Sequence, residues 1–152
     1  NFFANEEKVN DLENQSLQKP FSKGEIREAI FGSYSDGAPG PDGLSFLFLQ
    51  NFWEVIKMDV IPMFDDFHKG KLDLYRLNFA VLTLIPKEKE ATSMKKFRPI
   101  SLINCIFKVF TKVLANRLAV LMNRLTSTNQ SAFIKGTFIL KSVVTAHEVL
   151  HK

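Results

Sequence analysis

The clearest periodic feature of the chain is a row of apolar residues between positions 103 and 125. An apolar residue returns every three or four positions, which is typical of an amphipathic helix with one buried face. The row consists of Ile103, Phe107, Phe110, Leu114, Leu118, Leu121 and Leu125. We therefore predict a long helix over about 103–125, ended by the polar run at 126–129.

A second helical row precedes it. Its stripe holds Phe48, Phe52, Ile56 and Val60, with Leu49, Trp53 and Met63 beside it. Pro62 is expected to kink or divide this helix, because proline lacks an N–H donor and clashes with the preceding turn. Gly70 is expected to end it, since glycine accepts the left-handed conformation that often follows a helix.

The N-terminal part of the chain has shorter patterns than the two helical rows. Ser22-Lys23-Gly24-Glu25 has the spacing of a capping box and predicts a helix through about Phe31, with Ile26, Ile30 and Phe31 inward. Residues 1–21 are polar and acidic and are predicted to be a tether or a short helix. Residues 37–43 are predicted to be a tight, stiff turn, and a last helix is expected to begin near Ile139.

Two short apolar segments, 79–85 and 97–103, flank a loop with four lysines and two glutamates. This pattern predicts an antiparallel hairpin with strands at about 79–85 and 97–102. The first segment is apolar on both alternating faces, with Thr83 as its only polar interior residue, so we expect it to be covered on both sides. Together with the helices, the hairpin predicts a mostly helical α+β fold.

Charge divides the chain into two halves. Residues 1–70 carry 6 Lys/Arg against 12 Asp/Glu, a net charge of −6, and residues 71–152 carry 14 against 4, a net charge of +10. A basic half of this size favours nucleic acid or nucleotides as partners, although a solvated surface of varying sign is an alternative. No apolar stretch reaches the roughly 20 residues of a membrane helix. A location inside the cell, nuclear or cytoplasmic, is expected.

Length and cysteine content add little more. With 152 residues, 45% of them hydrophobic, the chain can form one domain with a real core, and its start without methionine suggests a piece of a longer chain. Cys105 is the only cysteine, which excludes a disulfide framework and a cysteine zinc cluster, and it is expected to be a small core residue.

The hairpin offers groups that can hold a polyphosphate. Arg98 can bind phosphate oxygens in a bidentate way and Lys87 can act as a mobile point charge. Pro99 restricts the backbone of Arg98 to an extended conformation. Lys108 and Lys112 face away from the apolar row, so a solvated face competes with phosphate contact, and Arg117 and Arg124 lie at the edge of the row.

An enzyme that transfers a nucleotide from a bound polyphosphate would also need carboxylates that hold two divalent metals. Such carboxylates are not evident in the sequence. The adjacent pair Asp65-Asp66 near the end of a helix is interpreted as solvated surface. Two functions other than polyphosphate binding also stay open. His147-Glu148-Val149-Leu150-His151 has the spacing of a zinc peptidase motif, with no third ligand evident. A non-catalytic RNA-binding module would use the same basic half.

Five strings in order carry a family resemblance: 38–44 (APGPDGL), 84–87 (LIPK), 97–104 (FRPISLIN), 114–118 (LANRL) and 130–136 (QSAFIKG). The chain from about Ser22 to Lys152 resembles the reverse transcriptase of LINE-type (non-LTR) retrotransposons, particularly those of plants. Two positions depart from the family, Gly37, where many relatives have a basic residue, and Thr137, where arginine is usual. The loss of template-side cations is compatible with a decayed copy.

The resemblance implies that residues 22–152 are the fingers and the beginning of the palm of an incomplete polymerase right hand, ending before the catalytic aspartates. It implies no catalytic or metal-binding residue here, inactivity alone, and Mg²⁺ in the full-length parent enzyme. The implied partners are the RNA template, the DNA primer, deoxynucleoside triphosphates (dNTPs) and the rest of the polypeptide, with no membrane.

The resemblance also implies roles for single residues. Arg98 would pack on the incoming base and contact the triphosphate, with Lys87 beside it. Template or other nucleic-acid contacts are expected of Lys95, Lys96, Lys108, Lys112, Arg117 and Lys135. Structural roles are expected of Pro39, Gly40, Pro41, Asp42, Gly43, Pro99, Gln130 and Gly136.

Overall fold

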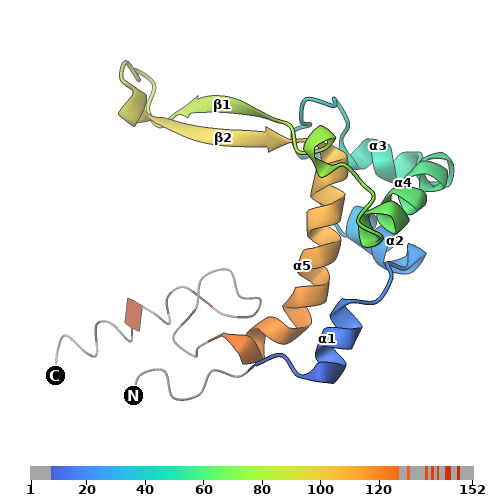
Figure 1. Cartoon of the computed structure of the whole chain (residues 1–152). Coiled ribbons are helices and arrows are strands. Elements are labelled where there is room, and N and C mark those ends of the chain that lie inside the picture. Colours follow the sequence, from blue (N-terminus) through green and yellow to red (C-terminus); the bar gives the residue numbers. More distant parts are fainter. Residues whose placement is uncertain are drawn as a thin grey trace. The chain divides into compact units, whose positions relative to one another are not determined.

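The structure is a computed structural model that describes residues 8–126 and the isolated positions 130, 136, 138, 140, 143, 144 and 147. Its described part is an α+β arrangement of five α-helices and one antiparallel two-stranded hairpin (Figure 1). The chain forms two compact units, Pro20–Val113 on the one hand and Asn1–Lys19 with Leu114–Lys152 on the other. The last helix expected near Ile139 lies largely outside the described residues.

Helix α2, Lys23–Phe31, begins with the capping box that the sequence predicts. The Ser22 hydroxyl accepts a hydrogen bond from the Glu25 N–H at 3.2 Å, and the Glu25 carboxylate accepts one from the Ser22 N–H at 2.9 Å. Ile26 and Ile30 are fully buried, as expected. The inward position predicted for Phe31 is wrong, because this ring is 42% exposed and carries the Arg27 guanidinium at 4.2 Å from its centroid.

The predicted second helix is divided, and the division is at Phe52 and not at Pro62. Helix α3 covers Phe46–Asn51, helix α4 covers Trp53–His68, and Phe52 between them has the non-helical angles φ −102° and ψ 19°. Pro62 lies inside α4 on an exposed position, and its missing N–H donor costs the helix one backbone hydrogen bond without ending it. Gly70, with φ +67°, follows the end of α4 as predicted.

The break at Phe52 changes which residues face the core. Phe48 and Phe52, placed on the apolar stripe by the sequence, are 40% and 51% exposed and pack on each other with ring centroids 4.8 Å apart. The buried residues of these two helices are Leu49, Trp53, Val60 and Phe64.

Helix α5, Cys105–Leu125, confirms the long predicted helix, starting two residues later. Its fully buried positions are Cys105, Val109, Phe110 and Val113, so the buried face is offset from the predicted row. Cys105 is a core residue as expected, whereas Leu114 and Leu118 are 37% and 45% exposed. The Phe110 ring stacks on Phe64 of α4 at 4.0 Å, which joins α4 to the first half of α5 in one core with α2 and α3.

Strands β1, Ala80–Pro86, and β2, Phe97–Ile103, form the predicted antiparallel hairpin. Short 3₁₀ turns, Leu74–Arg76 and Met94–Lys96, precede β1 and β2. The expectation that β1 is covered on both faces is wrong, because Val81 and Leu82 are 50% and 63% exposed and only Thr83 is half-buried. Most residues of both strands are exposed, and β2 is half-buried only at its two ends. In Figure 1, β2 leads almost directly into α5.

In the other unit, the acidic N-terminal segment contains helix α1, Asp11–Leu17. Its start is a second capping box, in which Asn10 and Glu13 each accept a bond from the backbone N–H of the other at 2.9 Å. Among the described helices of the whole chain, none combines the length and the apolarity needed to cross a membrane.

Candidate nucleotide and nucleic-acid site

The strand register determines which side chains accompany Arg98. Residues directly opposite each other in an antiparallel pair project from the same face, and Arg98 is opposite Ile85. The same face carries Thr83 and Ile100, a second opposed pair. Arg98 is exposed, and the structure shows no ion pair for its guanidinium with any described residue. It is therefore a cation on an apolar strand face, available for a ligand.

Contacts at the hairpin tip hold Lys87 and Lys96, two of the other predicted cationic residues, in place. The Lys87 N–H donates to the Lys96 carbonyl at 2.8 Å and the Lys87 Nζ donates to the Lys95 carbonyl at 2.8 Å. Lys96 Nζ forms an ion pair with Glu88 at 2.6 Å. These contacts cross from one side of the tip to the other, so the basic residues beside Arg98 lie on a closed turn.

The base of the hairpin is fixed by Asn104, which lies between β2 and α5. Its backbone N–H donates to the Phe79 carbonyl at 3.2 Å, and its side-chain amide donates to the Leu77 carbonyl at 3.1 Å. The Asn104 Oδ1 accepts the backbone N–H of Asp42 at 3.0 Å. One side chain thus ties the start of β1 and the 38–43 turn to the start of α5.

Asp42 caps α5 from a distant part of the chain. Its Oδ2 accepts the Cys105 N–H at 2.6 Å, and its Oδ1 accepts the Leu44 N–H at 3.2 Å. A carboxylate at this position satisfies an N–H without an intrahelical partner and lies favourably in the helix dipole. The sequence predicts Asp42 in a stiff turn but does not reveal its partner, because Cys105 is 63 positions away.

Two glycines let the 38–43 turn adopt this position. A Cβ atom on Gly40 would overlap the Ile103 carbonyl oxygen and lie 2.5 Å from the Ile103 carbonyl carbon and 2.6 Å from the Asn104 nitrogen. All three are backbone atoms, so a side chain has no room at this approach. Gly43 has φ +69°, the left-handed conformation in which other residues are strained.

Burial and charge both act on Cys105. Burial first, and then the nearby Asp42 carboxylate, raise the pKa of the Cys105 thiol from 9.0 to about 11, against a smaller opposite effect of Lys108. The thiol is therefore neutral near pH 7 and serves packing.

Lys108 is more enclosed than the sequence predicts. Lys108 is half-buried and its Nζ donates to the Ala38 carbonyl at 3.0 Å. Lys112, one turn further along α5, is exposed as expected. Both lysines line a cavity of about 460 Å³ between α5 and the loop after α2. Their contact with nucleic acid stays a prediction.

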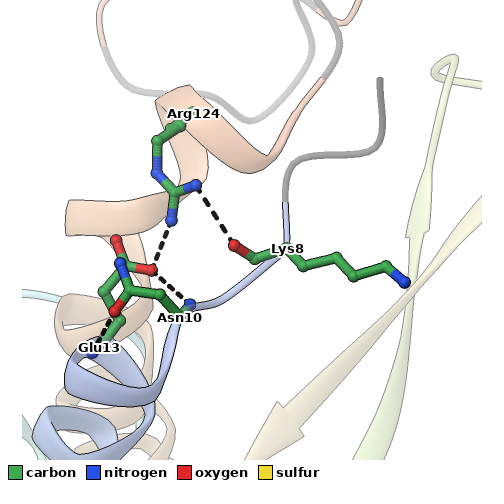
Figure 2. Close-up of polar contacts among 4 residues, drawn as sticks. All are labelled: Lys8, Asn10, Glu13 and Arg124. Atoms are coloured by element: carbon green, nitrogen blue, oxygen red, sulfur yellow. Dashed lines mark hydrogen bonds and ion pairs between the residues drawn. The ribbon is translucent and has the colours of Figure 1, made fainter. Parts of the chain in front are cut away.

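Arg117 and Arg124 lie on the second half of α5 and bind the N-terminal segment. The Arg117 Nη1 donates to the carbonyls of Leu17 and Lys19 at 2.9 and 2.6 Å, at the end of α1. Figure 2 shows Arg124 donating to the Glu13 carboxylate at 2.5 Å and to the Lys8 carbonyl at 3.3 Å. These contacts give both arginines a structural role, and the nucleic-acid contact expected of Arg117 stays a prediction.

The charge of Glu13 is supported from two sides. The hydrogen bond from the Asn10 N–H has the largest effect and lowers the pKa of the Glu13 carboxyl below 4.5; burial comes second and opposes it, and the Arg124 guanidinium lowers the pKa further. Glu13 is therefore ionised at neutral pH, which matches its place in the capping box and beside Arg124.

Several predicted site residues lie outside the described part. Lys135 and Thr137 are among them, as are Glu148 and His151 of the peptidase-like motif. Gln130 is described as exposed, and Gly136 has φ +85°. Within the described part of the chain, no group of three metal-binding side chains comes together, and Asp65 and Asp66 are both exposed.

Comparison with known proteins gives one informative similarity. The chain is 29% identical over 144 residues to the transposon TX1 uncharacterized 149 kDa protein of Xenopus laevis. The match covers 94% of this chain but only 11% of that protein, so the chain spans about a ninth of its relative. No protein-family model matches the chain. The chain is thus similar, over almost its whole length, to one segment of a large transposon protein.

Proposed function

We propose that this chain is the fingers and the beginning of the palm of a LINE-type retrotransposon reverse transcriptase, of the kind found in plants. The single observation that carries the proposal is the hairpin that presents Arg98 opposite Ile85, on the strand that runs directly into the capped start of α5. The similarity to a transposon protein over 94% of the chain supports the same origin.

The proposed task of the hairpin is to hold the triphosphate of an incoming dNTP. Arg98 supplies a planar, permanently charged group that can bind two phosphate oxygens at once. The exposed apolar neighbours Ile85 and Ile100 on its face offer surface on which a base could pack. Lys87, fixed across the tip by its bond to Lys95, adds a second positive charge.

In this proposal the chemistry itself belongs to the rest of the parent enzyme. Phosphoryl transfer requires Mg²⁺ held by carboxylates, and the parent palm would supply those carboxylates, the primer grip and the metal. The chain would contribute nucleotide and template contacts, and alone it would not extend a primer.

Primer extension by the complete parent enzyme tests the role of Arg98. Arg98→Ala removes a charge-assisted phosphate contact worth roughly 1.5–3 kcal/mol, which lowers kcat/KM for dNTPs about 10- to 150-fold. The matched control is Arg76→Ala, because Arg76 is an 85% exposed arginine before β1 whose nearest acid, Asp73, is 3.7 Å away. Equal kcat/KM values for the two variants would reject the assignment of Arg98.

A further inference from the structure

The cavity between α5 and the loop after α2 is a preformed space large enough for a ligand. Its volume of about 460 Å³ is within the range of small-molecule sites. One wall is held in place by Gln50, whose side-chain amide donates to the carbonyls of Ile30 and Ser33 at 3.0 and 3.1 Å. The Leu47 N–H donates to the Ser35 carbonyl at 3.4 Å and fixes the same loop to α3.

The chemistry of the lining selects an anion that also has a flat apolar part. Two lysines, Lys108 and Lys112, lie on one side, and no carboxylate is among the residues that line the cavity. Other lining residues are apolar, among them Leu44, Phe46 and Leu102. No lining carboxylate pairs with the two lysines, although the Asp42 carboxylate that binds the Cys105 N–H lies next to the cavity, and the apolar lining can accept a group that is not itself charged.

Tyr34 supplies the element that points to a nucleotide. Tyr34 is among the residues that line the cavity, and it is 74% exposed, so its ring is accessible to a ligand. Aromatic rings beside a basic groove are the usual stacking surfaces for bases of single-stranded nucleic acid. Lys112, whose ammonium shows no described partner, lies on the same cavity and can reach a phosphate.

We infer that this cavity binds one nucleotide of a single-stranded nucleic acid, with the base against Tyr34 and its phosphodiester at Lys112 and Lys108. The site is separate from the Arg98 face of the hairpin. The inference extends the proposed function, since the strand would be the template, and it rests on that proposal for the identity of the strand.

The test is the binding of a fluorescein-labelled single-stranded RNA 10-mer to the 152-residue chain, followed by fluorescence anisotropy over a range of salt. Tyr34→Ala is expected to raise Kd roughly 5- to 150-fold, the effect of losing one stacked base, while Tyr34→Phe binds like the wild type. Lys112→Gln is expected to lower the slope of log Kd against log salt by about 0.7, the contribution of one phosphate contact.

Lys71→Gln is the matched control, because Lys71 is an exposed lysine outside the cavity and its loss should leave the slope nearly unchanged. A thermal unfolding midpoint (Tm) equal to that of the wild type verifies that each variant is folded. Wild-type affinity and slope in both Tyr34→Ala and Lys112→Gln would overturn the inference. Displacement of the RNA by free dNTP, or equal binding of an RNA duplex, would overturn the assignment of a single strand.

The two proposals fail separately in these measurements. The RNA-binding assay contains no nucleotide substrate and measures no synthesis, so an unchanged Arg98→Ala enzyme would leave the cavity result intact. Conversely, loss of dNTP use in Arg98→Ala together with unaltered RNA binding in Tyr34→Ala would reject only the cavity.

Discussion

Asp42 fixes the start of α5, and its replacement by alanine should measurably destabilise the chain. Asp42→Ala removes the acceptor of the Cys105 N–H bond at 2.6 Å and of the Leu44 N–H bond at 3.2 Å. The bond from the Asp42 backbone N–H to Asn104 does not depend on the side chain and can remain. The change therefore isolates the cap from the rest of the junction.

The magnitude follows from two known effects. Loss of an N-terminal cap costs about 0.5–2 kcal/mol, and loss of a carboxylate beside a helix N-terminus costs about 0.3–1 kcal/mol. Because Asp42 is exposed, a total of about 1–2 kcal/mol is expected for Asp42→Ala. Asp42→Asn keeps an oxygen acceptor but loses the charge, so about 0.3–1 kcal/mol is expected.

Thermal unfolding followed by far-ultraviolet circular dichroism measures the effect. For a chain of this length each kcal/mol shifts Tm by about 2–4 °C, which gives a decrease of about 2–8 °C for Asp42→Ala and about 1–4 °C for Asp42→Asn. Amide hydrogen exchange at Cys105 should also become faster in Asp42→Ala.

Asp36→Ala is the control, since Asp36 is an exposed acid in the same loop, and its effect should stay within about 0.5 kcal/mol. A wild-type Tm together with unchanged exchange at Cys105 in Asp42→Ala would refute the reasoning, because the cap would then contribute nothing.

Two further predictions concern the backbone approach of the turn and the contact between α1 and α5. Gly40→Ala should destabilise the chain by about 1–3 kcal/mol in urea unfolding, because its Cβ meets backbone atoms of Ile103 and Asn104. Gly24→Ala should instead stabilise it by about 0.5–1 kcal/mol, since the new Cβ in α2 meets only the Ser22 hydroxyl at 3.8 Å. A Gly40→Ala chain more stable than the Gly24→Ala chain would contradict the close backbone approach at Gly40. Glu13 has a lowered pKa, so its stabilising contacts are present above pH 4.5 and are lost as the pH falls through the lower folded-state value. The Tm difference between wild type and Glu13→Gln should therefore decrease as the pH falls below 4.5, and a difference that stays constant from neutral pH to the lowest pH at which the chain is folded would disprove this linkage.

Local features of the fold were predictable from the sequence. The capping box at Ser22, the two strands, the long helix and the helix end at Gly70 depend on residues within a few positions of each other. The division at Phe52 was not predictable in this way, because the apolar spacing continues through it. A sequence pattern records that Phe48 and Phe52 are apolar but not that their rings pack on each other at the surface.

Most contacts around the candidate site could not be predicted from the sequence. The position of Asp42 at α5, the bond from Lys108 to Ala38 and the two carbonyls bound by Arg117 join residues 63 to 100 positions apart. A pattern of charges cannot show such pairs, since any exposed lysine or arginine has the same local surroundings. The covered strand predicted from the apolar faces of β1 failed for a related reason, because the cover must come from elements distant in sequence.

The most direct test of the account is a titration of the ¹⁵N-labelled chain with a dNTP and Mg²⁺, followed by nuclear magnetic resonance. Chemical-shift changes are expected at Arg98, at Lys87 and at the strand residues opposite them, and they should disappear in Arg98→Ala but remain in Arg76→Ala. No shift changes at the hairpin, or the same changes in both variants, would contradict the claim that this hairpin holds the incoming nucleotide.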